Sequence, residues 1–145
     1  MAKRGTKNIN ATISAFNGII FKSKLEKYAY IKIKEKLKIE PVYEAKRYVL
    51  QQPFTLENDI YEGSKTGIKL ANKNIRPITY TPDFEFIYND KYYIVETKGR
   101  PNEAFPLRWK MFKKLINENK DTNPIVFMPQ NQKQIDEMLQ IIKNN

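Results

Sequence analysis

The sequence predicts an α/β domain built on a mixed sheet, with its elements in the order α-β-β-β-α-β-α. Two observations predict this class. Segments with apolar residues at helical spacing are interspersed with β-rich runs, and a two-residue turn joins the two clearest runs into a hairpin. A strand, a helix and a second strand in succession imply a right-handed parallel crossover. At 145 residues, the chain has the length of one domain.

The first half of the chain predicts one helix and one strand. Residues 23–38 carry an apolar stripe at helical spacing, and Ser23 and Glu26 have the form of a capping box at its start. Residues 42–50, after Pro41, have the Val, Tyr and Leu content of a strand. We predict a flexible basic arm over residues 1–17, followed by a single domain over residues 18–145. An insertion or long loop over residues 51–76 interrupts this domain.

The second half contains the clearest unit. Residues 77–88 and 91–97 are β-rich runs separated by Asn89-Asp90, a short hairpin turn. A helix is expected from about residue 106 to 119, then a short strand over 125–128, then a last helix from about residue 131. The strand over 125–128 should lie parallel to 91–97.

Composition narrows the possible functions. The formal charge is +10, and the chain has neither His nor Cys. These absences exclude thiolate and histidine metal sites and histidine-based catalysis, so Asp, Glu and Lys would have to carry any chemistry. The charge indicates a polyanionic partner, nucleic acid first. An anionic membrane is disfavoured because the basic residues do not border one uninterrupted apolar helix face. With no apolar run near 20 residues and no signal peptide, a cytoplasmic protein is expected.

The hairpin places two carboxylates face to face. With Asn89-Asp90 as turn residues, Asp83 lies opposite Glu96, and Lys98 projects on the same side as Glu96. Two carboxylates about 4 Å apart repel by about 4 kcal/mol at an effective dielectric of about 20. A divalent cation between them reverses the sign, and oxygen ligands suit Mg²⁺ or Mn²⁺. Glu85, by contrast, is expected to be solvated.

The residues around Asp83, Glu96 and Lys98 resemble the signature of a known family. Thr79-Tyr80-Thr81-Pro82-Asp83-Phe84, followed by Ile94-Val95-Glu96-Thr97-Lys98-Gly99, resembles the signature of the PD-(D/E)XK nuclease superfamily. Within it, the chain is most similar to the phage endonuclease I family of Holliday-junction resolvases, which also carry a Glu on a preceding helix. Here Phe21-Lys22-Ser23-Lys24-Leu25-Glu26 fits that context. The resemblance covers roughly residues 19–128, but residues 51–76 have no counterpart in it.

The resemblance implies a restriction-endonuclease-like core and a Mg²⁺-dependent (or Mn²⁺-dependent) DNA endonuclease. The implied catalytic set is Glu26, Asp83, Glu96 and Lys98, and the implied metal ligands are Asp83, Glu96 and Thr97. The capping box is a competing explanation for Glu26, although one residue can serve both roles. The residues expected to contact DNA phosphates are Lys3, Arg4, Lys7, Lys22, Lys24, Arg100, Arg108 and Lys110.

Branched DNA is the substrate that the resemblance favours, which implies a phage enzyme acting in the cytoplasm of a bacterial host. Junction resolvases act in pairs, so a homodimer is expected. Two alternatives remain open: a nuclease of the same chemistry that acts on DNA ends or on a specific sequence, and a non-catalytic DNA-binding module on the same fold.

Overall fold

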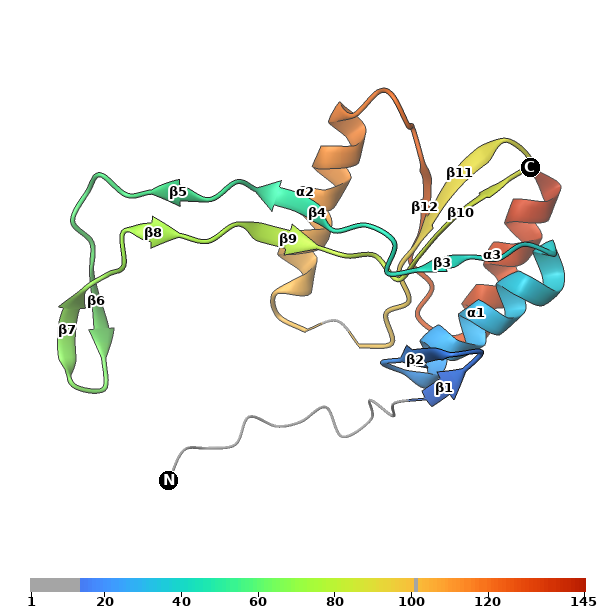
Figure 1. The fold of residues 1–145 in the computed structure, drawn as a ribbon, viewed down its shortest axis with the longest axis horizontal. Helices are drawn as coiled ribbons and strands as arrows, with labels where there is room; N and C mark the ends of the chain where they lie inside the picture. Colours follow the sequence, from blue (N-terminus) through green and yellow to red (C-terminus); the bar gives the residue numbers. More distant parts are fainter. Residues whose placement is uncertain (1–13, 101) are drawn as a thin grey trace.

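The computed structural model describes residues 14–100 and 102–145. The predicted contacts Lys3, Arg4 and Lys7 therefore lie outside the described residues. The fold is α/β, as predicted: a small mixed sheet has helices on both faces, and a two-stranded ribbon projects from one side (Figure 1).

The central sheet has the strand order β12-β11-β10-β3. Its strands are β3 (Val42–Tyr43), β10 (Phe84–Tyr88), β11 (Lys91–Val95) and β12 (Ile125–Phe127). In the β10–β11 hairpin, Tyr88 pairs with Lys91 and Phe84 with Val95, so the predicted register is confirmed. The turn residues Asn89 and Asp90 have φ of 48° and 64°, as a tight hairpin turn requires. Strand β12 runs parallel to β11, as predicted.

Three helices in the described chain cover this sheet: α1 (Lys24–Leu37), α2 (Phe105–Glu118) and α3 (Gln132–Asn144). Helices α1 and α3 pack with Tyr93 and Val95 of β11 in one apolar cluster. Helix α2 packs with Ile94 of the same strand in a second cluster. Because neighbouring residues of a strand face opposite sides, β11 is buried on both faces. This explains its continuous apolar run.

Two predicted strands are each divided in the structure. The segment 42–50 forms β3 and then β4 (Tyr48–Gln51), and 77–88 forms β9 (Ile78–Tyr80) and then β10. Glu44 adopts a left-handed φ of 48°, which ends β3, and Pro82 lacks the N–H that a continuous ladder would need. Strands β4 and β9 pair with each other and leave the central sheet.

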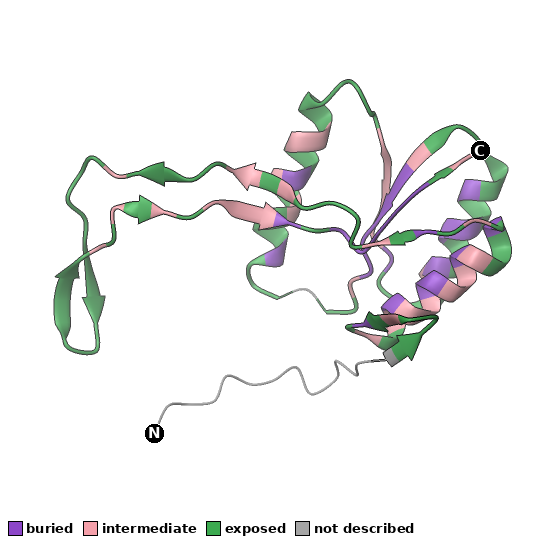
Figure 2. Cartoon of the chain, in the orientation of Figure 1, coloured by how far each residue is buried: buried purple, intermediate pink, exposed green. Residues whose placement is uncertain are grey.

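The segment predicted as an insertion or long loop is a β-ribbon. Strands β5 (Phe54–Thr55) and β8 (Asn74–Ile75) pair in its middle, and β6 (Tyr61–Ser64) and β7 (Gly67–Leu70) form the hairpin at its end. We call residues 52–76 the ribbon and residues 56–71 its tip. No residue of the ribbon is buried, and Figure 2 shows it lying clear of the rest of the molecule.

A hairpin precedes helix α1. Strands β1 (Ser14–Phe16) and β2 (Ile19–Phe21) are joined by Asn17 and Gly18, both with positive φ. The expected flexible arm extended through residue 17, so its last residues are instead part of this hairpin. Phe21 is fully buried in the cluster under α1, which fixes the start of that helix. No helix among the described residues is long and apolar enough to cross a membrane.

Candidate active site

Asp83 and Glu96 lie one step beyond the last paired residues of the β10–β11 hairpin. There the chain leaves the central sheet to form the β4–β9 pair. The N–H of Glu44 donates to the backbone oxygen of Asp83 at 2.8 Å. The N–H of Glu96 donates to the carbonyl of Phe127 at 2.9 Å, and that of Lys98 to the carbonyl of Pro129 at 3.0 Å. Hydrogen bonds to the neighbouring segments therefore fix the backbone positions of Asp83 and Glu96.

Thr97 holds the Asp83 carboxylate in place. Its N–H and its hydroxyl both donate to Oδ2 of Asp83, at 2.7 and 2.6 Å. Both residues are buried, with 7% of each exposed. These two bonds satisfy one carboxylate oxygen and stabilise its charged form.

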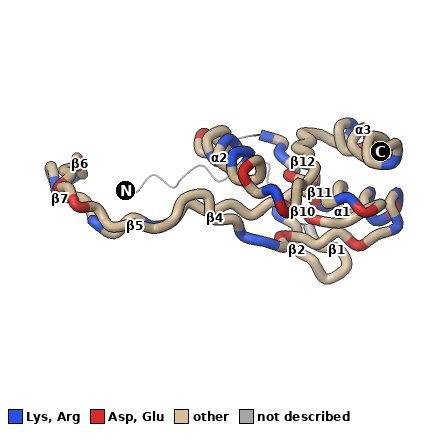
Figure 3. The backbone as a smooth tube through the Cα atoms, turned by 90° about the horizontal axis from the view of Figure 1, so that it is seen from above, with Lys and Arg blue, Asp and Glu red and all other residues tan. Residues whose placement is uncertain are grey.

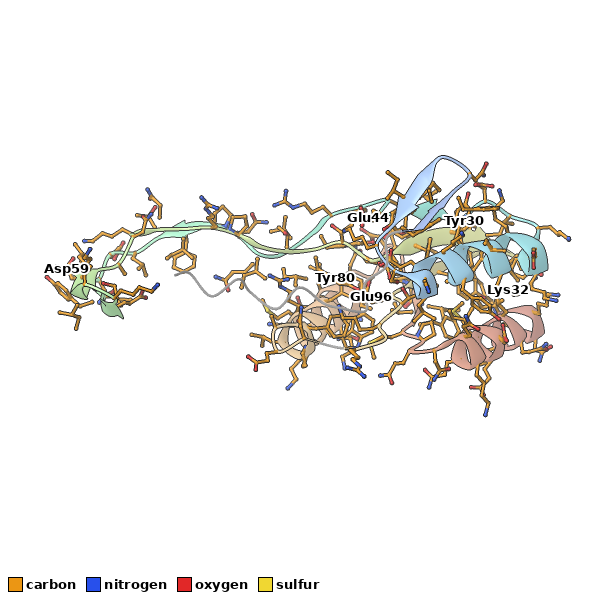
Figure 4. All side chains as sticks on the ribbon, turned by 90° about the horizontal axis from the view of Figure 1, so that it is seen from below. Tyr30, Lys32, Glu44, Asp59, Tyr80 and Glu96 are labelled. Atoms are coloured by element: carbon orange, nitrogen blue, oxygen red, sulfur yellow. The ribbon has the colours of Figure 1, made fainter. Side chains whose placement is uncertain are left out.

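Glu96 is also buried, but no pair of hydrogen bonds like those from Thr97 to Asp83 is present at its carboxylate among the described residues. Only 6% of the residue is exposed, and its Oε2 has no hydrogen-bond partner among the described residues. The neighbouring Tyr80 hydroxyl is also buried without a partner. Both side chains lie where the ribbon joins the body (Figure 4). A buried carboxylate oxygen with no partner is costly, so this position calls for a ligand or a proton.

The pKa values of both carboxyls are raised. Burial is the main cause of the raised pKa of Asp83, and the charges of Glu96 and Glu26 raise it further, against the two bonds from Thr97. Burial raises the pKa of Glu96 to about 7, while Tyr80 and the Lys98 charge oppose the rise. Because these carboxylates lie close together, each disfavours the charged form of its neighbour.

Glu26 belongs to the same cluster. It is 8% exposed, and its Oε2 accepts hydrogen bonds from the N–H of Lys22 at 3.0 Å and from the Tyr43 hydroxyl at 2.8 Å. Ser23 caps helix α1 by accepting from the N–H of Glu26 at 3.1 Å. The predicted cap is therefore present, but the Glu26 carboxylate bonds to Lys22, not back to Ser23. Its negative charge raises the pKa values of both Asp83 and Glu96.

Lys98 lies at the edge of the acidic cluster. Its Nζ is 4.5 Å from the centre of the Phe105 ring, at the start of helix α2. Its charge lowers the pKa of Glu96. Lys98 is half-buried. The structure thus brings all four residues of the predicted catalytic set together.

The donor set suits a hard divalent cation. All the candidate ligands are oxygens, and one of them, Oε2 of Glu96, has no other partner. Across residues 14–100 and 102–145, no group of three or more His, Cys, Asp or Glu side chains is arranged to enclose a metal by itself. Mg²⁺ does not need such an enclosure, because it is usually held by one or two carboxylates and keeps waters and substrate phosphates in its shell.

The predicted phosphate contacts that are described lie on the surface around this site. Lys24, Arg100, Arg108 and Lys110 are exposed. Figure 3 shows Lys and Arg positions along helices α1 and α2. Lys22 is also exposed, but its Nζ forms an ion pair with Glu44 at 2.6 Å. The structure therefore leaves Lys22 less available to a phosphate than the other four.

Two features of this region differ from the sequence-based expectations. Glu85, expected in solvent, is only 7% exposed, because Tyr48 of the ribbon base covers it and donates to its Oε1 at 2.6 Å. Tyr43 and Tyr80 were not recognised as site residues. Tyr80 does lie within the Thr79–Phe84 motif, three residues before Asp83, whereas only the fold brings Tyr43 to Glu26.

A comparison with protein families places the chain. A family model matches residues 5–127, which is most of the sequence, and its description is "Protein of unknown function (DUF1064)". No curated protein and no solved structure matches the chain. The matched range includes the whole acidic cluster, the ribbon and helix α2. The chain therefore belongs to the DUF1064 family.

Proposed function

We propose that this protein is a Mg²⁺-dependent (or Mn²⁺-dependent) DNA endonuclease with a PD-(D/E)XK core. The observation that carries the proposal is the buried carboxylate oxygen of Glu96, which has no hydrogen-bond partner within residues 14–100 and 102–145 and lies beside Asp83 and Glu26. If these acids had no catalytic role, replacing one of them with a neutral residue would make the folded protein more stable.

In this mechanism Asp83 and Glu96, together with the backbone carbonyl of Thr97, would hold the cation. When bound, the cation would lower the pKa of a water and offset the charge of the scissile phosphate. The hydrogen bonds from Thr97 keep the Asp83 carboxylate fixed for this role. Glu26, held by Tyr43, adds negative charge that strengthens cation binding.

Lys98 would act on the phosphate. Attack of a water oxygen on phosphorus adds negative charge to the non-bridging oxygens, and the bond to the leaving oxygen then breaks. An ammonium group placed at the edge of the site stabilises that charge. The Phe105 ring below Lys98 restricts where its Nζ can lie.

We further propose branched DNA as the substrate, on the resemblance to phage junction resolvases. A homodimer acting in the cytoplasm of an infected bacterium belongs to the same proposal. The exposed basic residues near the site, above all Arg108 and Lys110 on helix α2, would bind the DNA backbone.

Cleavage assays test the proposal. The protein is incubated with four-way-junction, linear duplex and single-stranded DNA, with Mg²⁺ or EDTA. We expect cutting only with Mg²⁺, preferentially of the junction, and a loss of at least about 100-fold in Asp83→Asn and in Lys98→Ala. Glu85→Gln is the matched control, since Glu85 is as buried as Asp83 but is satisfied by Tyr48; it should still cut.

The other outcomes separate the alternatives. Cutting that survives EDTA or either substitution would refute the chemistry. Equal cutting of all three DNAs would refute the junction preference alone and favour a nuclease with another DNA target. Binding without cutting in every condition would favour a non-catalytic DNA-binding module.

A further inference from the structure

Strand β4 has one edge that no other strand covers. It pairs with β9 and with no further strand of the described chain. Outside that pair, residues 46–51 form no other backbone–backbone hydrogen bond with any described residue. The unpaired N–H and C=O groups along a strand edge are a template on which another extended chain can pair.

A groove runs along this free edge. Its volume is about 590 Å³, and its lining includes residues 46–49 but no residue of β9. Because neighbouring side chains of a strand point to opposite faces, a groove lined by both Tyr48 and Val49 borders the edge of β4 and not one of its faces. The groove therefore lies on the side of β4 that β9 leaves open.

The rest of the lining is mainly apolar. It comes from the β10–β11 hairpin and from the end of helix α2, which lies beside β4 in Figure 1. Two of the apolar side chains that line the groove, Val49 and Ile87, are 38% and 66% exposed. The other apolar lining residues are Leu115, Ile116 and Pro124. The groove thus offers apolar side chains next to unpaired backbone groups.

The charge of the groove is positive. Lys46 and Arg47 line it and are exposed, and neither forms an ion pair with a described residue. The Nζ of Lys46 lies 4.8 Å from the centre of the Tyr48 ring, at the start of β4. No acidic side chain lines the groove. Glu85 is buried and accepts the hydrogen bond of the Tyr48 hydroxyl.

Acidic residues that are close to the lining residues in sequence do not cancel this charge. Glu44 already forms an ion pair with Lys22 at 2.6 Å, and Glu118 lies 3.8 Å from Lys114. The other two acids are each next to a lysine in the sequence, in the pairs Asp90-Lys91 and Lys120-Asp121. The charge that remains is that of Lys46 and Arg47.

This combination selects an acidic peptide over nucleic acid. A DNA strand presents a phosphate about every 3.4 Å, so it would need basic residues along the whole groove, whereas the two present are adjacent in sequence and the rest of the lining is uncharged. The chain's own residues 1–13 have three basic residues and no acidic one, so they do not match the groove either. The ligand chemistry that fits is an extended segment of another protein with apolar and acidic side chains.

We propose that the groove along β4 is a docking site for an extended acidic peptide of a partner protein, which adds to β4 as a third strand. Main-chain hydrogen bonds to the free edge would provide affinity, as in other strand-addition complexes. Specificity would come from apolar side chains packed against Ile87 and Val49 and from carboxylates beside Lys46 and Arg47. This role is separate from the proposed nuclease chemistry.

A displayed library of short random peptides identifies the ligand class. The library is panned against the whole protein, after peptides that also bind Ile87→Glu have been removed. We expect the enriched peptides to be acidic, with Val, Ile, Leu or Phe at alternate positions. Enrichment of basic or uncharged peptides, or no enrichment at all, would overturn the proposal.

Affinities of the most enriched peptide, labelled with a fluorophore and measured by anisotropy, test the residues. Ile87→Glu and Lys46→Ser/Arg47→Ser should each weaken binding at least tenfold. Ile68→Glu is the matched control, because Ile68 is 73% exposed against 66% for Ile87 but lies on the ribbon tip. It should change binding less than twofold. Equal losses in all three variants would contradict the site.

Hydrogen exchange tests the added strand itself. Amide protons of β4 that do not pair with β9 should exchange at least tenfold more slowly when the peptide is bound, while those of the ribbon tip should not change. Binding without this protection would overturn strand addition. Protection of the same amides by a single-stranded oligonucleotide, with no peptide binding, would assign the groove to nucleic acid and overturn the proposal.

These results are separable from the proposed nuclease activity. Asp83→Asn should bind the peptide like wild type, although it is expected not to cut DNA. If the peptide binds at β4 and no DNA is ever cut, the docking site stands and the nuclease proposal fails. If DNA is cut and no peptide binds, the reverse holds.

Discussion

Two buried glutamates, Glu85 on β10 and Glu96 just after β11, differ in how their carboxylates are hydrogen-bonded. Glu85 and Glu96 are 7% and 6% exposed, so burial alone does not separate them. Glu85 accepts a hydrogen bond from Tyr48 at 2.6 Å, whereas Oε2 of Glu96 has no partner. A fold satisfies its buried polar groups unless a site uses them. The unpaired oxygen, not the burial, therefore distinguishes Glu96 from Glu85 and is what supports the proposed metal site.

The raised pKa values predict how stability depends on pH. Burial raises the pKa of Glu96 to about 7 and that of Asp83 well above its usual range. Between the unfolded value of about 4.5 and the folded value, the folded protein holds a proton that the unfolded chain has released. In EDTA, the free energy of unfolding should therefore fall as pH rises across this window. The loss is at most about 1.4 kcal/mol per pH unit for each carboxyl.

Thermal melting at about pH 5 and about pH 8 measures this effect. The melting temperature in EDTA should be lower at the higher pH, and Mg²⁺ should raise it more there, because a cation binds the charged carboxylates. Glu96→Gln should flatten both responses. A Mg²⁺ effect of the same size at both values of pH would contradict the prediction.

At the scale of elements, the sequence predicts best where local signals agree. Asn89-Asp90 fixes the hairpin turn, and with it the opposition of Asp83 and Glu96, because the register follows from the turn. The division of the strand over 42–50 was not predictable. Its Val, Tyr and Leu residues favour strand, whereas Glu44, Ala45 and Lys46 between them do not. The sequence does not show that the chain breaks there and leaves the sheet, because the break at Glu44 involves a hydrogen bond to Asp83, 39 positions further along the chain.

The ribbon was only partly predictable for a similar reason. Its Gly, Pro and Asn residues mark it as irregular, and its strands are too short to give a clear alternation. Pairing between Phe54 and Ile75 is a long-range contact that no local pattern announces. The sequence therefore indicates that an insertion is present, but not that it is an ordered ribbon.

The structure predicts that the ribbon can be removed without loss of the fold. Neither apolar cluster contains any residue from 52 to 76. Replacing this segment with Asn-Gly between Gln51 and Pro77 should leave the circular dichroism spectrum helical and cost less than about 1 kcal/mol. Phe112→Ala, in the fully buried centre of the α2 cluster, should cost about 3–5 kcal/mol. Chemical denaturation compares the two, and an unfolded deletion variant would contradict the prediction.

At the scale of the whole molecule, charge and site occupy different parts of the fold. The acidic cluster lies where β4 and β9 leave the central sheet. Helices α1 and α2 carry basic residues along their length (Figure 3).

The surface charge predicts a strong and local salt dependence of DNA binding. Each phosphate contact contributes about 0.9 to the slope of log K against log salt concentration on duplex DNA. Arg108 and Lys110 lie exposed on helix α2, beyond Lys98, so alanine at either position should reduce the slope by about one.

Binding is measured in an Asp83→Asn background, so that the DNA is not cut. Lys114→Ala is the matched control. It removes the same type of charge from the same helix, but Lys114 lies a turn further from the site and its Nζ is 3.8 Å from Glu118. Its slope should remain that of the parent. If all three alanine variants lower the slope equally, the basic residues attract DNA through the overall positive charge and not through specific phosphate contacts. That result would contradict docking of the N-terminal end of helix α2 on the DNA.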